Sequence, residues 1–175
     1  RAASAETWNI NRRRAEVLLG YYVGLQSEFF AGRVRTIIGT RRNEYSRNSY
    51  YDRAVNTPEI ATPKAKKTTP LYGALVKLTP RLSAFAMYSE SFEPQLGVDA
   101  DGRGLDPVKG KGYDVGLKSS LLDGRLAGTV SFYGIKRESL SVRDRDREIA
   151  TGRQPWFIYG DAEESQGIEM DLSYN

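Results

Sequence analysis

The connections between the apolar segments of this chain alternate strictly between tight turns and long loops. About seven short segments carry apolar side chains at every second position, as a β-strand with one apolar face does. The tight connections lie at residues 30–32, 79–80 and 121–124, and the long connections lie at residues 46–70, 92–111 and 139–161. Transmembrane β-barrels combine short periplasmic turns with longer outer loops. The alternation therefore predicts an all-β, antiparallel up-and-down meander that spans a membrane.

The predicted strands are segments in which the apolar residues share one parity. They are residues 17–29, 33–45, 71–78, 81–91, 113–118, 125–137 and 168–174. Successive side chains of a strand point to opposite faces, so one face of the sheet carries Leu19, Ile38, Val76, Val130 and Leu172. We call it the apolar face and predict that hydrocarbon, rather than a protein core, covers it.

Charged and aromatic residues of the apolar face are placed as this prediction requires. A Lys or Arg that faces lipid at the midplane costs about 2–4 kcal/mol, and the cost falls towards zero at the interfaces. The charged residues of this parity adjoin long loops, and they are Arg42, Glu90 and Lys136. Aromatic side chains gather where a bilayer meets water. One predicted aromatic row, near the long loops, consists of Tyr72, Tyr88 and Tyr113, and a second, near the tight turns, consists of Phe29 and Tyr174.

The opposite face is polar, and parity leaves its environment open. Residues such as Arg35, Lys118 and Glu169 would be wet in a half-buried soluble sheet, and they would line the lumen in a barrel. We call this side the polar face.

Composition removes several classes of chemistry. The chain has 175 residues and no histidine or cysteine, which excludes within it a Ser-His-Asp triad, thiol catalysis and zinc sites built from these ligands. No run approaches the roughly 18 apolar residues of a membrane-spanning helix. The net charge of +4 is compatible with an anionic partner but does not specify one.

Several motifs together resemble the barrel of TonB-dependent outer-membrane receptors. They are Tyr-Ser-Glu-Ser-Phe-Glu-Pro at residues 88–94, Leu-Asp-Pro at 105–107, Tyr-Asp-Val-Gly-Leu-Lys at 113–118, Leu-Leu-Asp-Gly-Arg-Leu at 121–126 and Ser-Gln-Gly-Ile-Glu-Met-Asp at 165–171. Residues 29–34 and 39–41 resemble the preceding hairpin of the family, except that Ala31 stands where an acidic residue is usual.

The resemblance also shows what this chain lacks. Neither the plug domain of the family nor its TonB box is recognisable in the sequence. Large transporters of this kind have about 22 strands, and about seven strands cannot close such a barrel. We therefore expect residues 1–175 to form a single partial β-barrel domain, a piece of a siderophore-receptor-like protein.

The resemblance implies energy-dependent uptake of ferric siderophores or similar scarce nutrients across the outer membrane of a Gram-negative bacterium. The partners it implies are outer-membrane lipid and lipopolysaccharide, the ligand, and the plug domain and TonB in the full-length protein. It implies no enzymatic activity, no cofactor, no bound metal and no nucleic acid. Arg12, Arg13 and Arg14 are candidate contacts for lipopolysaccharide phosphates.

Aromatic and basic residues at the ends of the strands and in the long loops are the candidate ligand contacts, because stacking and charge together suit an anionic chelate with aromatic arms. The candidates are Tyr51, Phe92, Arg103, Tyr133, Arg137, Trp156 and Tyr159. The alternating charges of residues 143–148 predict a self-paired extension of a strand. Asp99 and Asp101 resemble the start of a calcium loop, but Val108 occupies the position of its bidentate Glu.

Two other functions remain compatible with the residues alone. One is a soluble antiparallel β-domain that binds an anionic partner, nucleic acid included, although no RNA-binding or OB-type motif is present. The other is an outer-membrane barrel enzyme, which would need carboxylate chemistry in a chain without an evident carboxylate pair.

Overall fold

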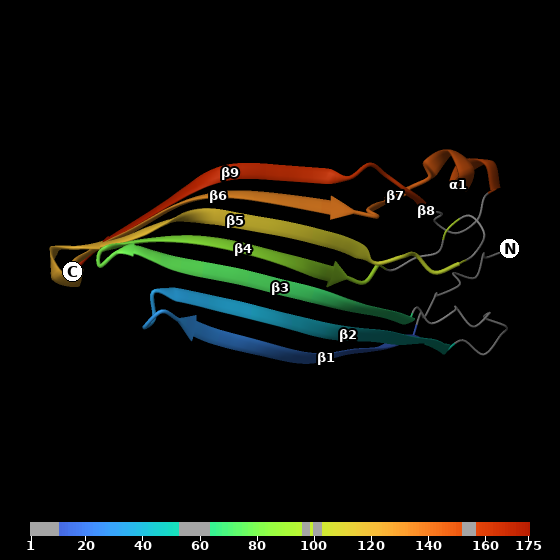
Figure 1. The fold of residues 1–175 in the computed structure, drawn as a ribbon. Helices are drawn as coiled ribbons and strands as arrows, with labels where there is room; N and C mark the ends of the chain where they lie inside the picture. Colours follow the sequence, from blue (N-terminus) through green and yellow to red (C-terminus); the bar gives the residue numbers. More distant parts are fainter. Residues whose placement is uncertain (1–10, 53–63, 96–98, 100–102, 152–156) are drawn as a thin grey trace, which may run out of the picture.

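A single curved layer of antiparallel β-sheet makes up most of the molecule (Figure 1). The computed structural model describes residues 11–52, 64–95, 99, 103–151 and 157–175. Its main sheet has seven strands in the order β1-β2-β3-β4-β5-β6-β9, so each strand pairs with the next long strand in the sequence. This arrangement confirms the predicted up-and-down meander.

The strands of the main sheet differ in length. They are β1 (Asn11–Phe29), β2 (Val34–Asp52), β3 (Lys64–Thr79), β4 (Leu82–Glu93), β5 (Val108–Leu121), β6 (Leu126–Glu138) and β9 (Glu163–Tyr174). A 3₁₀ turn, η1 (Leu122–Gly124), joins β5 to β6. The connection from β6 to β9 contains the short hairpin of β7 (Ser141–Arg143) and β8 (Phe157–Tyr159), with the helix α1 (Arg145–Thr151) between them. None of the described helices has the length and apolar character needed to cross a membrane.

The tight turns all lie at one end of the sheet and the long connections at the other, which we call the turn end and the loop end (Figure 1). Gly32 and Gly124 occupy the left-handed backbone region in two of these turns, with φ of 77° and 92°. Glycine adopts a positive φ without the steric cost that a Cβ would add, which suits it to these two turns. Ala31 also has a positive φ, of 53°, at the position where the family usually has an acidic residue.

The register of the sheet brings the predicted apolar positions onto one face. Val130 on β6 pairs with Leu117 on β5 and with Met170 on β9. The same row continues through Ala84 on β4 to Val76 on β3. Because a shift of one residue would turn every side chain to the opposite face, this alignment across the strands confirms the reading by parity.

In the part of the chain that the structure describes, no second layer of protein covers the apolar face. Among the described residues, the buried hydrophobic side chains are Tyr45, Leu105 and Val108, and all three lie towards the loop end. By contrast, Val130 is 44% exposed and Leu172 is 74% exposed. A soluble sheet of this size would bury its apolar side against another element. The hydrophobic side chains of this face are therefore available to contact lipid.

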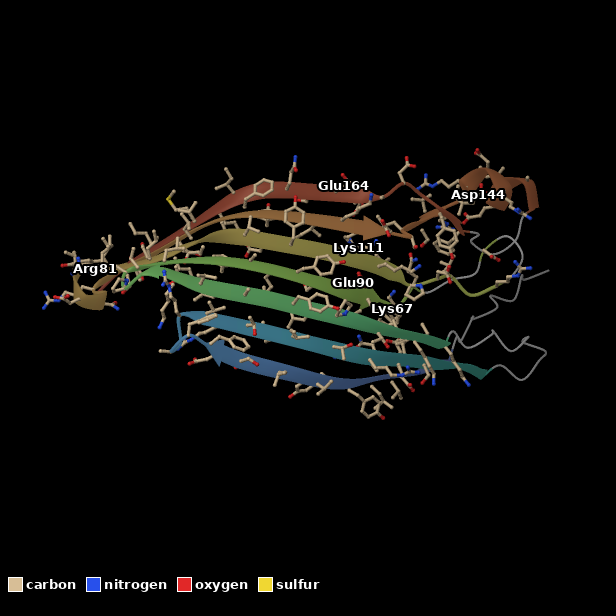
Figure 2. All side chains as sticks on the ribbon, in the orientation of Figure 1. Lys67, Arg81, Glu90, Lys111, Asp144 and Glu164 are labelled. Atoms are coloured by element: carbon tan, nitrogen blue, oxygen red, sulfur yellow. The ribbon has the colours of Figure 1, made fainter. Side chains whose placement is uncertain are left out.

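Tyrosines and charges mark the boundary of the apolar face towards the loop end. The rings of Tyr72 and Tyr88 stack with their centroids 6.3 Å apart, and the Tyr88 hydroxyl donates a hydrogen bond of 2.9 Å to Glu90. Figure 2 shows Glu90, Lys111 and Glu164 in one row across β4, β5 and β9. Aromatic rings below a line of charges are typical of the level at which hydrocarbon meets headgroups.

The strands β2 and β3 extend further than the sequence predicts. The loop expected at residues 46–70 begins inside the sheet, because β2 continues to Asp52 and β3 begins at Lys64. Ser46 pairs with Lys64 in this extension. Beyond the bilayer both faces meet water, so alternation of apolar residues ends while the hydrogen-bonded ladder continues. The sequence pattern therefore reports the part of the strand inside the membrane.

The charge run at residues 143–148 does not form the predicted strand extension. Arg143 ends β7, and the chain then turns into α1. The Arg143 guanidinium pairs with Glu148, which raises the pKa of Arg143 first by hydrogen bonding and then by its charge. The Asp144 carboxylate accepts a hydrogen bond of 3.1 Å from the backbone N–H of Arg147. The bond to Asp144 favours a helical turn, because an aspartate just before a helix caps the free N–H groups of its first turn.

Candidate ligand-binding end of the sheet

Most of the predicted ligand contacts that the structure describes lie at the loop end of the sheet or in its connections, and Tyr133 lies in the middle of β6. Tyr51 lies near the end of β2, in the part of the strand whose side chains are outside the description. Trp156 lies outside the described residues altogether. The other five are Phe92, Arg103, Tyr133, Arg137 and Tyr159. Their roles in ligand binding stay a prediction.

Arg137 lies on the polar face and joins three strands through ion pairs. Its guanidinium is 3.0 Å from Glu93 on β4 and 3.3 Å from Glu163 on β9. It reaches Glu93 across β5, whose residue at this level is Gly110. The cation is therefore shared between two carboxylates, and a ligand anion would have to compete with both.

Replacing Arg137 by glutamine is expected to lower the free energy of unfolding by at most about 1 kcal/mol. The three side chains are between 42% and 69% exposed, and exposed ion pairs contribute little. Denaturant unfolding of the full-length protein in bilayers measures the loss. A loss above about 2 kcal/mol would contradict the view that solvent screens this network.

Tyr133 and Phe92 lie on opposite faces of the sheet. Tyr133 is on the polar face, and a Cβ on Gly167 would lie 2.8 Å from its hydroxyl oxygen, so the ring occupies the space that this glycine leaves. Next to Tyr133 on β5, Asp114 has a buried Oδ1 atom without a hydrogen-bond partner. Phe92 has the parity of the apolar face and pairs with Lys109.

Arg103 and Asp99 are hydrogen-bonded to each other in the connection between β4 and β5. The Arg103 backbone N–H donates a 2.8 Å hydrogen bond to the Asp99 carboxylate, and the Asp99 backbone N–H donates one of 2.8 Å to the Arg103 carbonyl. Asp101, the other acidic residue of the calcium-like motif, lies outside the description. In the part of the chain that the structure describes, no three acidic residues are placed to hold a metal ion.

Gln95 links the β4–β5 and β6–β9 connections at this end of the sheet, a role that no pattern in the sequence indicates. Its Nε2 donates hydrogen bonds of 2.6 Å to the carbonyls of Asp106 and Ser139. Its Oε1 accepts bonds from the backbone N–H and the hydroxyl of Ser141, at 3.0 and 2.6 Å. The Tyr159 hydroxyl adds a further link, because it accepts a 2.8 Å bond from the Asp106 backbone N–H. We call these five residues the loop cluster.

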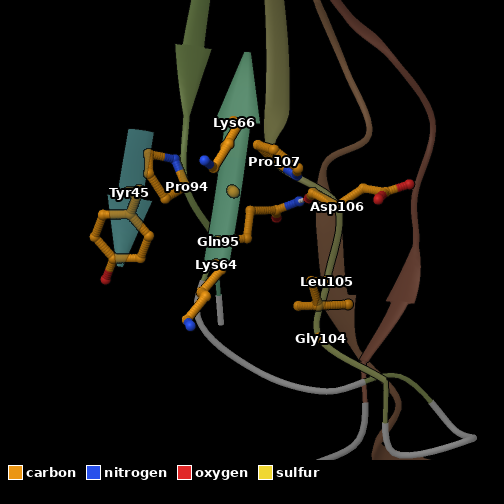
Figure 3. A pocket seen from close by; sticks show the side chains of 10 residues that line it. Tyr45, Lys64, Lys66, Pro94, Gln95, Gly104, Leu105, Asp106 and Pro107 are labelled. Atoms are coloured by element: carbon orange, nitrogen blue, oxygen red, sulfur yellow. Dashed lines mark hydrogen bonds between the residues drawn. The ribbon is translucent and has the colours of Figure 1, made fainter. Parts of the chain in front are cut away.

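A shallow pocket of about 390 Å³ lies beside the loop cluster (Figure 3). One wall is formed by Tyr45, Lys64 and Lys66 from β2 and β3. The other wall comes from the connection between β4 and β5, and it consists of Pro94, Gln95, Gly104, Leu105, Asp106 and Pro107. Lys66 is paired with Glu44 at 3.2 Å. Lysine beside apolar walls can accept an anionic group of a ligand.

The family of the chain follows from comparison with known sequences. The family described as "TonB dependent receptor-like, beta-barrel" matches residues 3–175. The chain belongs to this family. Its members are outer-membrane receptors rather than enzymes, so the polar face is the inner wall of a barrel, the loop end points outside and the turn end points to the periplasm. The family excludes the soluble β-domain and the barrel enzyme.

Curated relatives within the TonB-dependent receptors include two from Pseudomonas. The ferric-pyoverdine 358 receptor of Pseudomonas putida is 29% identical over 95% of this chain and 20% of its own length. The metal-pseudopaline receptor of Pseudomonas aeruginosa is 33% identical over 66% of this chain and 17% of its own length. The chain thus spans about a fifth of the length of these relatives.

Solved outer-membrane receptors share the fold of the sheet. The alcaligin outer-membrane receptor of Bordetella pertussis superposes with a TM-score of 0.74 at 22% identity, over 93% of this chain and 28% of that protein. The ferripyoverdine receptor of Pseudomonas aeruginosa superposes with a TM-score of 0.73 at 21% identity, over 97% of this chain and 22% of the receptor. The open sheet therefore corresponds to one sector of a larger barrel wall.

Proposed function

We propose that this chain is a sector of the barrel of a TonB-dependent receptor that takes up a ferric siderophore or a similar metal chelate. The observation that carries the proposal is the family match over residues 3–175, together with a single-layer sheet whose apolar face is not covered by any residue that the structure describes. Relatives named for ferric pyoverdine and metal-pseudopaline support a metal chelate as the ligand class.

The loop end supplies the chemistry for capturing such a ligand. Lys64 in the shallow pocket and Arg137 on the polar face offer positive charge. Tyr133 on the polar face and Tyr159 in the loop cluster offer aromatic surface. Charge and stacking together suit an anionic chelate. The earlier candidates Tyr51, Phe92, Arg103 and Trp156 remain part of this proposal as further contacts.

The other parts of the transport machinery belong to the proposal as well. Residues 1–175 would form one barrel domain, and the polar face would surround a plug domain that engages TonB in the full-length protein. The apolar face would contact outer-membrane lipid. Lipopolysaccharide would meet the loop end of β1, where Arg12, Arg13 and Arg14 follow the first residue of the strand.

Uptake of radioactive iron by cells that lack the full-length gene tests the proposal. We expect the deletion strain to lose uptake of at least one complex in a panel of ferric siderophores that includes pyoverdine, and a plasmid copy to restore it. In a strain without TonB, the restored receptor should bind the same complex but not import it. Unchanged uptake of every complex in the panel would contradict the proposal.

A further inference from the structure

The side-chain amide of Gln95 forms four hydrogen bonds with the two loops around it. The amide group of glutamine offers two donor hydrogens and one acceptor oxygen with two lone pairs. Both donors reach backbone carbonyls, those of Asp106 and Ser139, and the oxygen accepts both the backbone N–H and the hydroxyl of Ser141. All four hydrogen-bonding positions of the group are therefore used.

The surrounding groups allow only one orientation of this amide. Rotating it by half a turn would place Oε1 against the two carbonyl oxygens and Nε2 against the Ser141 backbone N–H. Three hydrogen bonds would then be lost. Two of them would become repulsive contacts between oxygen atoms, and the third would become a contact between two N–H donors. A carboxylate at this position would likewise set its charge against the two carbonyls. The network thus requires a side chain that both donates and accepts, at this length.

The four bonds connect segments that are far apart in the sequence. Gln95 and Asp106 stand at the two ends of the connection between β4 and β5, so their bond closes that loop. Ser139 and Ser141 begin the connection between β6 and β9, so their bonds join the second loop to the first. The Tyr159 hydroxyl contacts Asp106 from the far end of the second loop.

Ser139 gives a further indication that the junction is constrained. Its φ is 64°, in the left-handed region that residues other than glycine seldom adopt. Such a conformation persists when surrounding contacts determine it. Here the Ser139 carbonyl is held by Gln95, and Ser141, two residues further on, is held by the same side chain.

We propose that Gln95 is a positioning residue that fixes the β4–β5 and β6–β9 loops to each other as one ligand-capturing unit. The inference rests on the proposed receptor function, and it extends that function to a residue that contacts the ligand only through its neighbours. Two candidate contacts, Arg103 and Tyr159, lie on the segments that Gln95 joins. Holding such groups in place before binding raises affinity by reducing the ordering required on binding.

Distance measurements between spin labels on the two loops test the joining directly. The chain has no cysteine of its own. With any cysteine elsewhere in the full-length receptor replaced, Gly104→Cys and Ile149→Cys place one label on each loop of the receptor in bilayers. Both positions are exposed. We expect a narrow distance distribution with Gln95 present, and a distribution at least twice as wide in both Q95A and Q95E. The control Q166A changes an exposed glutamine on β9 outside the loop cluster, and it should leave the width unchanged.

Binding of ferric pyoverdine to the same variants tests the positioning role. We expect Q95A and Q95E to raise the Kd at least tenfold. The Kd of Q166A should equal that of the unlabelled parent. An unchanged distance distribution in Q95A and Q95E would overturn the inference, as would a widened distribution with an unchanged Kd. If the parent binds neither pyoverdine nor any other ferric siderophore, the proposed function fails instead, and the distance distribution alone then decides whether Gln95 joins the loops.

Discussion

Replacing Val130 by arginine is expected to lower the free energy of unfolding of the full-length receptor by about 2–4 kcal/mol. Val130 lies within β6 on the apolar face, between Leu117 and Met170 on the neighbouring strands, and no described residue covers this row. The charge would therefore enter hydrocarbon close to the bilayer midplane. Equilibrium unfolding in denaturant after refolding into bilayers measures the change.

The matched control is Val130→Met, which has a long side chain without a charge. We expect this variant to differ from the parent by less than about 0.5 kcal/mol, because a lipid-facing side chain does not have to fit a packed protein core. Equal losses for methionine and arginine would show that Val130 meets protein instead of lipid, and would contradict the account of the apolar face.

Replacing Gly116 by alanine is expected to cost about 1–3 kcal/mol, the range for overpacking. Gly116 is on the polar face of β5, and a Cβ there would collide with the backbone carbonyl of Val130. The added Cβ would also lie 2.8 Å from the Phe85 ring and 2.8 Å from the Cβ of Ser131. The carbonyl belongs to the β5–β6 ladder, so relief of this contact requires a shift of the backbone.

Gly112 provides the control on the same strand and the same face. A Cβ on Gly112 would have its nearest neighbours at 3.8 and 3.9 Å, which is ordinary contact. Alanine there should be neutral or should stabilise by up to about 1 kcal/mol, because it reduces the freedom of the unfolded chain. Parallel unfolding curves for G116A and G112A make the comparison. Equal stability of the two variants would show that the close β5–β6 approach at Gly116 is absent.

The strands inside the membrane could be predicted from the sequence because lipid imposes a strict rule on one face. A charged side chain is costly at every lipid-facing position between the tyrosine row and the turns. The period-two pattern of apolar residues such as Leu19, Val76 and Val130 can therefore be recognised in each strand. Outside the bilayer this rule is absent. The paired extension up to Asp52 and the helix from Arg145 were therefore missed.

The candidate site was predictable only as a region. The long connections indicated where a ligand would be caught, but no periodicity indicates which loop residues hold one another. Gln95 gave no signal, because a lone glutamine after a proline is typical of any loop and its partners are mainly backbone groups 11 to 46 positions away. For Phe92, however, parity indicates the face of the sheet. Phe92 continues the series of Leu82 and Tyr88, so it belongs to the apolar face and not to the polar face.

Spin-label accessibility along β6 tests the central claim, that hydrocarbon covers the apolar face of the sheet. The full-length receptor in bilayers carries one spin label at a time, at Thr129, Val130, Ser131 or Phe132. Each labelled receptor is exposed to oxygen, which enters lipid, and to a water-soluble nickel complex. We predict high oxygen and low nickel collision rates at Val130 and Phe132, and low oxygen collision rates at Thr129 and Ser131. Rates without this alternation, or high nickel collision rates at Val130 and Phe132, would contradict the account.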